Sequence, residues 1–129
     1  MTKNAHLKPT AAELEILQIL WKYGPSTVRF VNEKLNERKV VGYTTTLKIM
    51  QLMNEKHFLE RETSQRSHIY CPLVKEKETQ GVLLDRFLET AFGGSALKLV
   101  MQILGHHRTS KAEIAQIKDF LKSLERGEE

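Results

Sequence analysis

The sequence predicts a mainly α-helical chain that contains one small β-hairpin. Two capping-box sequences, Thr10–Glu13 and Ser110–Glu113, predict where helices begin. Apolar residues recur at helical spacing along most of the chain, and only residues 58–73 have the composition of short strands. These observations divide the chain into a first half with three helices and a hairpin, and a second half that is wholly helical.

The first two helices are short and lie close together in the sequence. The first begins after Thr10 and ends at Gly24-Pro25, because glycine and proline interrupt helices. Its apolar residues recur every three or four positions and form one face. Ser26 or Thr27 then caps a second helix. The apolar face of that helix consists of Val28, Val31 and Leu35.

A third helix is expected from about Tyr43 to Lys56, after a polar stretch and a short extended piece at Val40-Val41. At 100° per residue, its side chains separate into two faces. The inward face is predicted to contain Thr46, Leu47, Met50, Met53 and Asn54. The outward face is predicted to contain Thr44, Thr45, Lys48, Leu52 and Glu55.

The hairpin completes a recognisable element order. Residues 58–63 and 68–73 are predicted strands joined by residues 64–67, and Pro72 closes the second strand. Three helices followed by a hairpin is the order of a winged helix-turn-helix, in which the third helix enters the major groove of DNA. We therefore expect residues 1–74 to form a winged helix-turn-helix DNA-binding domain.

The outward face of the third helix suits contact with DNA. Thr44 and Thr45 lie in the first turn, where unpaired backbone amides and the helix dipole favour a phosphate. Lys48, one turn later, can reach a guanine edge or another phosphate. For each residue alone, a helix-capping threonine or a solvated lysine is the alternative interpretation; the three together favour DNA contact.

The loop between the strands would be the wing of this fold. Arg66 is expected to reach a backbone phosphate or the adjacent minor groove, and Ser67 lies beside it. Arg29 lies near the start of the second helix, where the geometry of winged-helix proteins suggests a phosphate contact. An ordinary solvated arginine is the alternative for both Arg66 and Arg29.

Residues 75–129 are predicted to be a helical dimerisation domain. Gly93-Gly94 ends one apolar helix, Ser95 opens a short second one, and Ser110 caps a third. Three short helices cannot enclose so much apolar surface alone, so a second copy of the chain is the expected cover; packing onto the chain's own first half is the alternative. The expected dimerisation residues are Leu84, Phe87, Leu88, Val100, Met101, Leu104, Ile117, Leu121 and Leu124.

Charge supports a polyanionic partner for the first half. Residues 1–75 contain 12 Lys and Arg against 7 Asp and Glu, whereas residues 76–129 contain 8 against 9. Positive charge therefore gathers where the DNA-binding domain is predicted, although solvated surface charge would give the same count. Double-stranded DNA is the expected partner.

Other classes of protein are disfavoured by composition. Cys71 is the single cysteine, and the adjacent His106 and His107 do not converge on one ion without additional ligands, so neither a metal site nor a cofactor is expected. No nucleophile elbow or concentrated acid–base pair suggests an enzyme. The chain has no apolar stretch of about 18 residues and no secretion signal, which favours a cytoplasmic protein without membrane insertion.

Four segments resemble the penicillinase repressor family, which comprises BlaI/MecI-type repressors and a copper-responsive CopY branch. These segments are Leu14–Trp21, Tyr43–Leu47, Tyr70–Leu73 and Phe92–Ser95, and the resemblance spans about residues 8–125. It implies a homodimeric repressor on a two-fold symmetric operator. In antibiotic-resistance members, a BlaR/MecR-type membrane metalloprotease signals, and cleavage in the helical region disrupts the dimer.

The sequence departs from the family pattern at three points. Leu52 stands where the family commonly has arginine, so the resemblance implies a different operator preference. The scissile Asn-Phe pair of lactam-responsive members falls on Gln102-Ile103, which makes this pair the candidate cleavage site. The cysteine pairs of the copper-responsive branch are absent, because Cys71 stands alone.

Two further interpretations remain open from the sequence. A winged-helix fold also serves as a protein-interaction module. A winged-helix regulator of another family, which binds a small molecule, is the other alternative.

Overall fold

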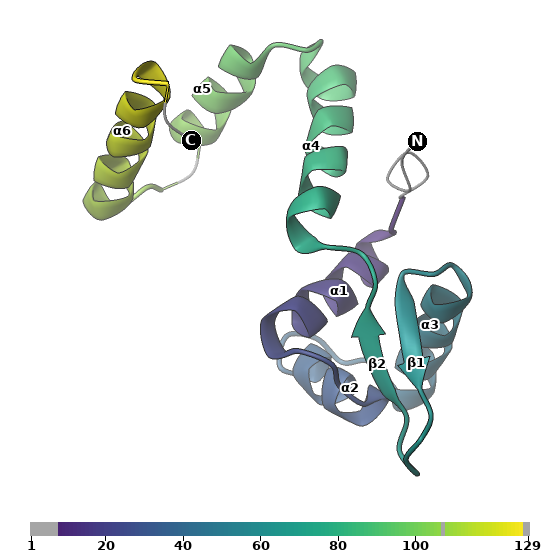
Figure 1. Ribbon diagram of the computed structural model, residues 1–129. Helices are drawn as coiled ribbons and strands as arrows, with labels where there is room; N and C mark the ends of the chain where they lie inside the picture. The colour runs from purple at the N-terminus through teal and green to yellow at the C-terminus, as the bar shows by residue number, and fades with distance from the viewer. Residues whose placement is uncertain (1–7, 107, 128–129) are drawn as a thin grey trace. The chain divides into compact units, whose positions relative to one another are not determined.

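The computed structural model describes residues 8–106 and 108–127 (Figure 1). It is mainly helical with one antiparallel hairpin, which confirms the predicted fold class. The elements are α1 (Ala11–Tyr23), α2 (Val28–Asn36), α3 (Tyr43–Glu55), β1 (Leu59–Glu62), β2 (Ile69–Pro72), α4 (Glu76–Phe92), α5 (Ala96–His106) and α6 (Lys111–Glu125).

The chain forms two compact units that divide within α4. We call the unit that ends at Asp85 the head, and the unit that begins at Arg86 the tail. The first turns of α4 belong to the head, and Thr79 in them is fully buried. Each unit is therefore described separately.

Local chemistry determines where the helices begin. The Thr10 hydroxyl accepts from the Glu13 amide at 3.1 Å, and the Glu13 carboxylate accepts from the Thr10 amide at 2.9 Å. The same reciprocal pair forms at Ser110 and Glu113, so both predicted capping boxes are confirmed. Thr27 caps α2, and its hydroxyl accepts from the Phe30 amide at 3.1 Å.

The hairpin is attached to the connection between α1 and α2 by a β-bridge that the sequence did not predict. Its strands pair antiparallel from Leu59 opposite Pro72 to Glu62 opposite Ile69. Ser26, in the connection between α1 and α2, forms an isolated β-bridge with Tyr70. The expected extended piece at Val40-Val41 is not part of any strand. The backbone amide and carbonyl of Val41 instead bond to side chains of α2, which removes them from sheet pairing.

A closed apolar core holds the head together. The predicted faces of α3 are confirmed, since Thr46, Met50 and Met53 are buried and the outward side chains are exposed. Burial of apolar side chains stabilises a fold by about 25 cal/mol per Å² removed from water. The buried apolar residues are Ile16, Leu17, Leu20, Val28, Val31, Leu35, Met50, Met53, Phe58, Leu59 and Tyr70.

The tail has no comparable core. The predicted end of α4 at Gly93-Gly94 is confirmed, because both glycines have positive φ and the Gly94 amide bonds to the Leu88 carbonyl at 3.0 Å. Across residues 86–106 and 108–127, no side chain is buried. In the described chain no single helix is long and apolar enough to cross a membrane, and only α4 and α5, as a sharply bent pair, have that length and composition together.

Candidate nucleic-acid interface

The outward face of α3 presents polar and cationic side chains on a rigid helix. Thr44, Thr45 and Lys48 are exposed, and α3 rests on the core through the opposite face. The helix begins at Gly42, which supplies no capping side chain. Neither Thr44 nor Thr45 is therefore the cap of this helix, and the amides of the first turn are left without a side-chain acceptor from Gly42.

Lys48 is available for an external anion. Among the described residues, no carboxylate lies within ion-pairing distance of its ammonium. Leu52 lies one turn further along the same face and is also exposed. The outward face of α3 thus carries hydroxyl groups at its start, one cation in the middle and an apolar side chain beyond it.

A hollow of about 340 Å³ lies between the wing and the starts of α2 and α3. Arg29 lines it from the first turn of α2, and Arg66 and Ser67 line it from the loop of the hairpin. Tyr43, the first residue of α3, lines it next to Thr44. The full lining is Thr27, Val28, Arg29, Tyr43, Leu47, Arg66, Ser67, His68 and Tyr70.

The fold therefore brings the six predicted DNA-contact residues to one part of the head. Arg29, Arg66 and Ser67 share the hollow, while Thr44, Thr45 and Lys48 follow directly from its edge at Tyr43. The lining contains two arginines and no carboxylate. Such a concave cationic surface attracts a polyanion, because its charges act together and are not neutralised locally.

Sequence reasoning missed Tyr43 and His68 as members of this hollow. The sequence predicts Tyr43 as the first residue of α3, and it puts His68 where the wing meets the second strand, with no role in DNA contact for either. The strand that follows His68 is joined to the connection before α2 by the bridge between Ser26 and Tyr70, whose two backbone bonds measure 3.1 and 2.8 Å. No local sequence pattern predicts that bridge, because Ser26 lies between α1 and α2 whereas Tyr70 lies in β2.

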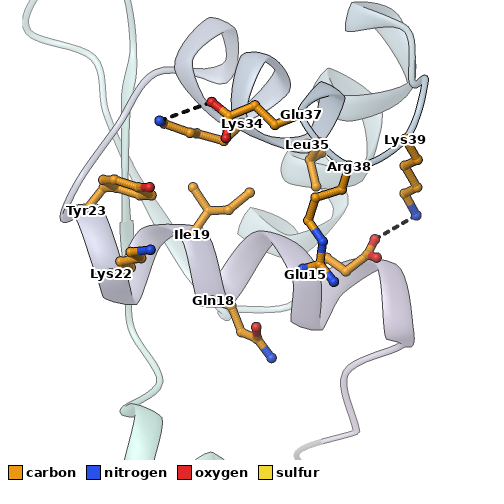
Figure 2. A pocket seen from close by; sticks show the side chains of 10 residues that line it. All are labelled: Glu15, Gln18, Ile19, Lys22, Tyr23, Lys34, Leu35, Glu37, Arg38 and Lys39. Carbon is orange, nitrogen blue, oxygen red and sulfur yellow. Dashed lines mark hydrogen bonds and ion pairs between the residues drawn. The ribbon is translucent and has the colours of Figure 1, made fainter.

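A second hollow, of about 230 Å³, lies between α1 and α2 (Figure 2). Its two carboxylates already pair with two of its cations, Glu15 with Lys39 at 2.8 Å and Glu37 with Lys34 at 3.2 Å. The Lys34 ammonium donates a hydrogen bond to the Glu37 carboxylate. This bond raises the pKa of Lys34 and so favours the charged form of that side chain. The lining is Glu15, Gln18, Ile19, Lys22, Tyr23, Lys34, Leu35, Glu37, Arg38 and Lys39.

This second hollow is the weaker candidate for a site. Its volume lies below the range of about 300–1,000 Å³ that is usual for ligand pockets. Lys34 lies 4.7 Å from the centre of the Tyr23 ring, so the aromatic face is already covered by a cation of the chain itself. The hollow shares no lining residue with the cationic hollow beside α3.

The candidate metal and thiol residues of the sequence lie in α5, in the segment after it and in β2. In the part of the chain that it describes, no group of three or more His, Cys, Asp or Glu side chains could hold a metal ion. His107, one of the two adjacent histidines, lies outside the described residues. Cys71 is a free thiol in β2 and is partly buried.

The predicted dimerisation residues lie on the three helices of the second half. Leu84, Phe87, Val100, Met101, Leu104, Leu121 and Leu124 are exposed, and Leu88 and Ile117 are partly buried. Met101 has 65% of its surface exposed, and Leu121 has 53%. Exposed apolar side chains in such number are typical of surfaces that bind another molecule.

The candidate cleavage pair Gln102-Ile103 lies inside α5, and both residues are exposed. The backbone at this bond is helical. A protease would therefore have to unwind part of α5 to reach it, and the lack of buried side chains in this helix lowers the free energy of that local opening.

Comparison with known proteins gives a consistent result. The profile of a family described as "Penicillinase repressor" matches residues 9–123. The transcriptional regulator BlaI of Mycobacterium tuberculosis is 26% identical over 89% of this chain and 83% of its own length. The penicillinase repressor of Bacillus licheniformis is 23% identical over 85% and 86%. The methicillin resistance regulatory protein MecI of Staphylococcus aureus is 20% identical over 92% and 96%.

Proposed function

The chain belongs to the penicillinase repressor family, a family of transcriptional repressors, and we propose that it acts as a homodimer that represses transcription from a two-fold symmetric DNA operator. Residues 1–74 would bind DNA, and residues 75–129 would join two chains. We further propose that it acts in the cytoplasm, without a cofactor and without enzymatic activity.

One observation carries the proposal that the head binds DNA. Arg29 and Arg66, which are far apart in the sequence, line the same hollow beside the exposed start of α3. In a winged helix-turn-helix this arrangement would put α3 in the major groove with cations on both flanks. The hollow would receive the phosphate backbone, and α3 would contact base edges.

Each residue then has a distinct role. The first-turn amides and the hydroxyl groups of Thr44 and Thr45 would hold a phosphate, and Lys48 would reach a base edge or a further phosphate. Arg66 and Ser67 would contact the backbone or the minor groove from the wing. Arg29 would neutralise a phosphate from the start of α2.

The exposed apolar faces of α4, α5 and α6 support the proposal of a dimer. A two-fold symmetric pair would cover these faces with identical faces of a second chain. Such a dimer presents two heads, which matches an operator with two half-sites. Linkage through the tail would then make the second head bind at high effective concentration.

Cleavage in the tail is the proposed route to derepression. A membrane metalloprotease of the BlaR/MecR type would cut at Gln102-Ile103 and separate part of α5 and all of α6 from the head. Exposure of Gln102 and Ile103 and the absence of buried side chains in α5 support this site. The two residues differ from the Asn-Phe pair of lactam-responsive members. We expect such cleavage to abolish dimerisation and to leave the head folded.

Fluorescence polarisation with the full chain tests the proposal. A duplex from upstream of the chain's own gene and a random duplex of equal length are compared at two salt concentrations. We expect preference for the first duplex and a steep loss of affinity as salt rises. A DNA affinity that depends neither on salt nor on duplex sequence would favour a protein-interaction module. A preference for the first duplex that appears only when a small molecule is added would favour a winged-helix regulator of another family.

A further inference from the structure

The connection between α2 and α3, residues 37–42, is held by side chains of α2 rather than by regular backbone pairing. The side-chain amide of Asn36 donates to the backbone carbonyl of Val41 at 2.9 Å. The backbone amide of Val41 donates to the side-chain oxygen of Asn36 at 3.1 Å. Asn32, one turn earlier, donates to the same Val41 carbonyl at 3.1 Å. Both polar backbone groups of Val41 are thus satisfied by two asparagines.

Asn32 also reaches into α3 itself. Its amide group donates to the Thr46 hydroxyl oxygen at 2.8 Å, and that hydroxyl in turn donates to the Gly42 carbonyl at 3.4 Å. Thr46 has 0% of its surface exposed, and Asn32 is partly buried. One side chain therefore bonds to Val41, two residues before α3, and to Thr46, the fourth residue of α3.

The core holds α3 through its inward face, but other features that could hold the connection before α3 are weak. Val40 has 98% of its surface exposed and anchors nothing. Gly42 gives α3 no capping side chain. Val41 does pack against the core, but an apolar contact leaves rotation of the connection less restricted than directional hydrogen bonds do.

We propose that Asn32 and Asn36 are positioning residues for sequence reading by α3. They would act through Val41 and Thr46 to set the direction of the first turn, from which Thr44, Thr45 and Lys48 project. This inference rests on the proposed function of the head. Base readout requires donor and acceptor atoms within a few tenths of an ångström of their ideal positions, whereas attraction to phosphates tolerates displacement.

The two kinds of DNA contact give a measurable distinction. Loss of the asparagine contacts reduces the preference for the operator over other DNA, but leaves binding to random duplex nearly unchanged. A purely structural role has a different result, because a smaller folded fraction lowers both affinities equally. The ratio of the two affinities is therefore the readout.

The experiment uses the full chain and a duplex selected from a random pool by the unmodified protein. Asn32→Ala, Asn36→Ala and the double variant are measured against this duplex and a scrambled one by fluorescence polarisation. We expect the affinity ratio to fall at least ~10-fold in the double variant, with scrambled-duplex affinity changed less than ~2-fold, since one lost base contact is worth about that much. Circular dichroism verifies that each variant is folded at the assay temperature.

Two further variants sharpen the test. Asn54→Ala is the matched control, because Asn54 is a partly buried asparagine of the head whose side chain makes no hydrogen bond among the described residues; its ratio should not change. Asn36→Asp keeps an acceptor for the Val41 amide and loses the donor, so an intermediate ratio is expected. It also replaces Asn36→Ala if that variant does not fold.

Amide hydrogen exchange supplies a direct readout of the connection. The Val41 amide should exchange slowly in the unmodified chain and faster in Asn36→Ala, with the amides of the core helix α1 unchanged. An unchanged affinity ratio, or parallel loss of both affinities, overturns the inference while the proposed function stands. If the unmodified chain selects no sequence, the proposed function fails and this inference fails with it.

Discussion

The head and the tail contain similar types of apolar side chain and place them differently. The head encloses eleven buried apolar residues between α1, α2, α3 and the hairpin. In the tail, nine large apolar side chains from Phe87 to Leu124 are exposed, and none of its described residues is buried. The head therefore buries its core within a single chain, whereas the apolar side chains of the tail remain exposed in a single chain.

This difference is the reason why we propose that the tail, and not the head, depends on a partner. A core that is closed within one chain is stable at any protein concentration, but an apolar face that is closed by a second copy depends on concentration through mass action. DNA binding by one head and pairing by two tails are then separable properties. The predictions below test that separation.

The largest effect is expected from removal of α6. A fragment that ends near Ile103, at Gln102 if the proposed bond is cut, should keep a folded head, sediment as a monomer or weak dimer, and bind a two-site operator ~10²–10⁴-fold less tightly, because linkage between heads is lost. Sedimentation velocity and fluorescence polarisation measure the two properties, and a duplex with a single half-site is the control. A fragment that remains a tight dimer with full operator affinity would show that pairing lies elsewhere and that cleavage at Gln102-Ile103 does not relieve repression.

A pair of leucine variants compares the two units directly. Leu17→Ala, at a fully buried position of α1, should lower the free energy of unfolding of the head by about 2–5 kcal/mol, since it leaves a cavity. Leu121→Ala, at an exposed position of α6, should leave unfolding of the head unchanged and weaken self-association. Urea unfolding followed by circular dichroism, together with sedimentation equilibrium, measures both. Equal destabilisation of the head by the two variants would contradict the division.

A smaller effect is expected on the outward face of α3. Lys48→Ala should weaken operator binding by about 1–3 kcal/mol if Lys48 contacts a base, with little change in the stability of the head. Binding isotherms on the operator and thermal unfolding give the two values. Unchanged affinity would remove this face of α3 from the DNA-binding surface.

The smallest effect is expected in the wing. Arg66→Ala should weaken binding to all duplexes by a similar factor and reduce the slope of log affinity against log salt by about one unit, since one phosphate contact is lost. A salt titration with operator and random duplex measures the slope for each. A slope equal to that of the unmodified chain would exclude Arg66 as a phosphate contact.

Local signals in the sequence were sufficient to predict most of the elements. Capping boxes at Thr10 and Ser110 predicted two helix starts, since a cap and its partner lie three residues apart. Helical spacing also separated the buried Met50 from the exposed Lys48 on α3. These features depend on neighbours in the chain, which a sequence displays directly.

Features that depend on distant residues were not predicted. The bridge of Ser26 to Tyr70 joins a loop to a strand, and Tyr43 and His68 from separate elements line the cationic hollow. The contacts of Asn32 with the connection before α3 were also missed, because an asparagine in a helix is ordinarily taken as a solvated residue. In the tail, periodicity identified the apolar faces but carries no information about the molecule that covers them.

The only tryptophan of the chain gives this protein an intrinsic optical probe. The indole nitrogen of Trp21 donates to the Val74 carbonyl at 3.0 Å, at the point where the hairpin has ended and α4 is about to begin. Loss of that bond would expose the ring to water and shift its emission to longer wavelength. Fluorescence of an unlabelled sample therefore reports whether the segment leading into α4 stays attached to α1 when DNA is added.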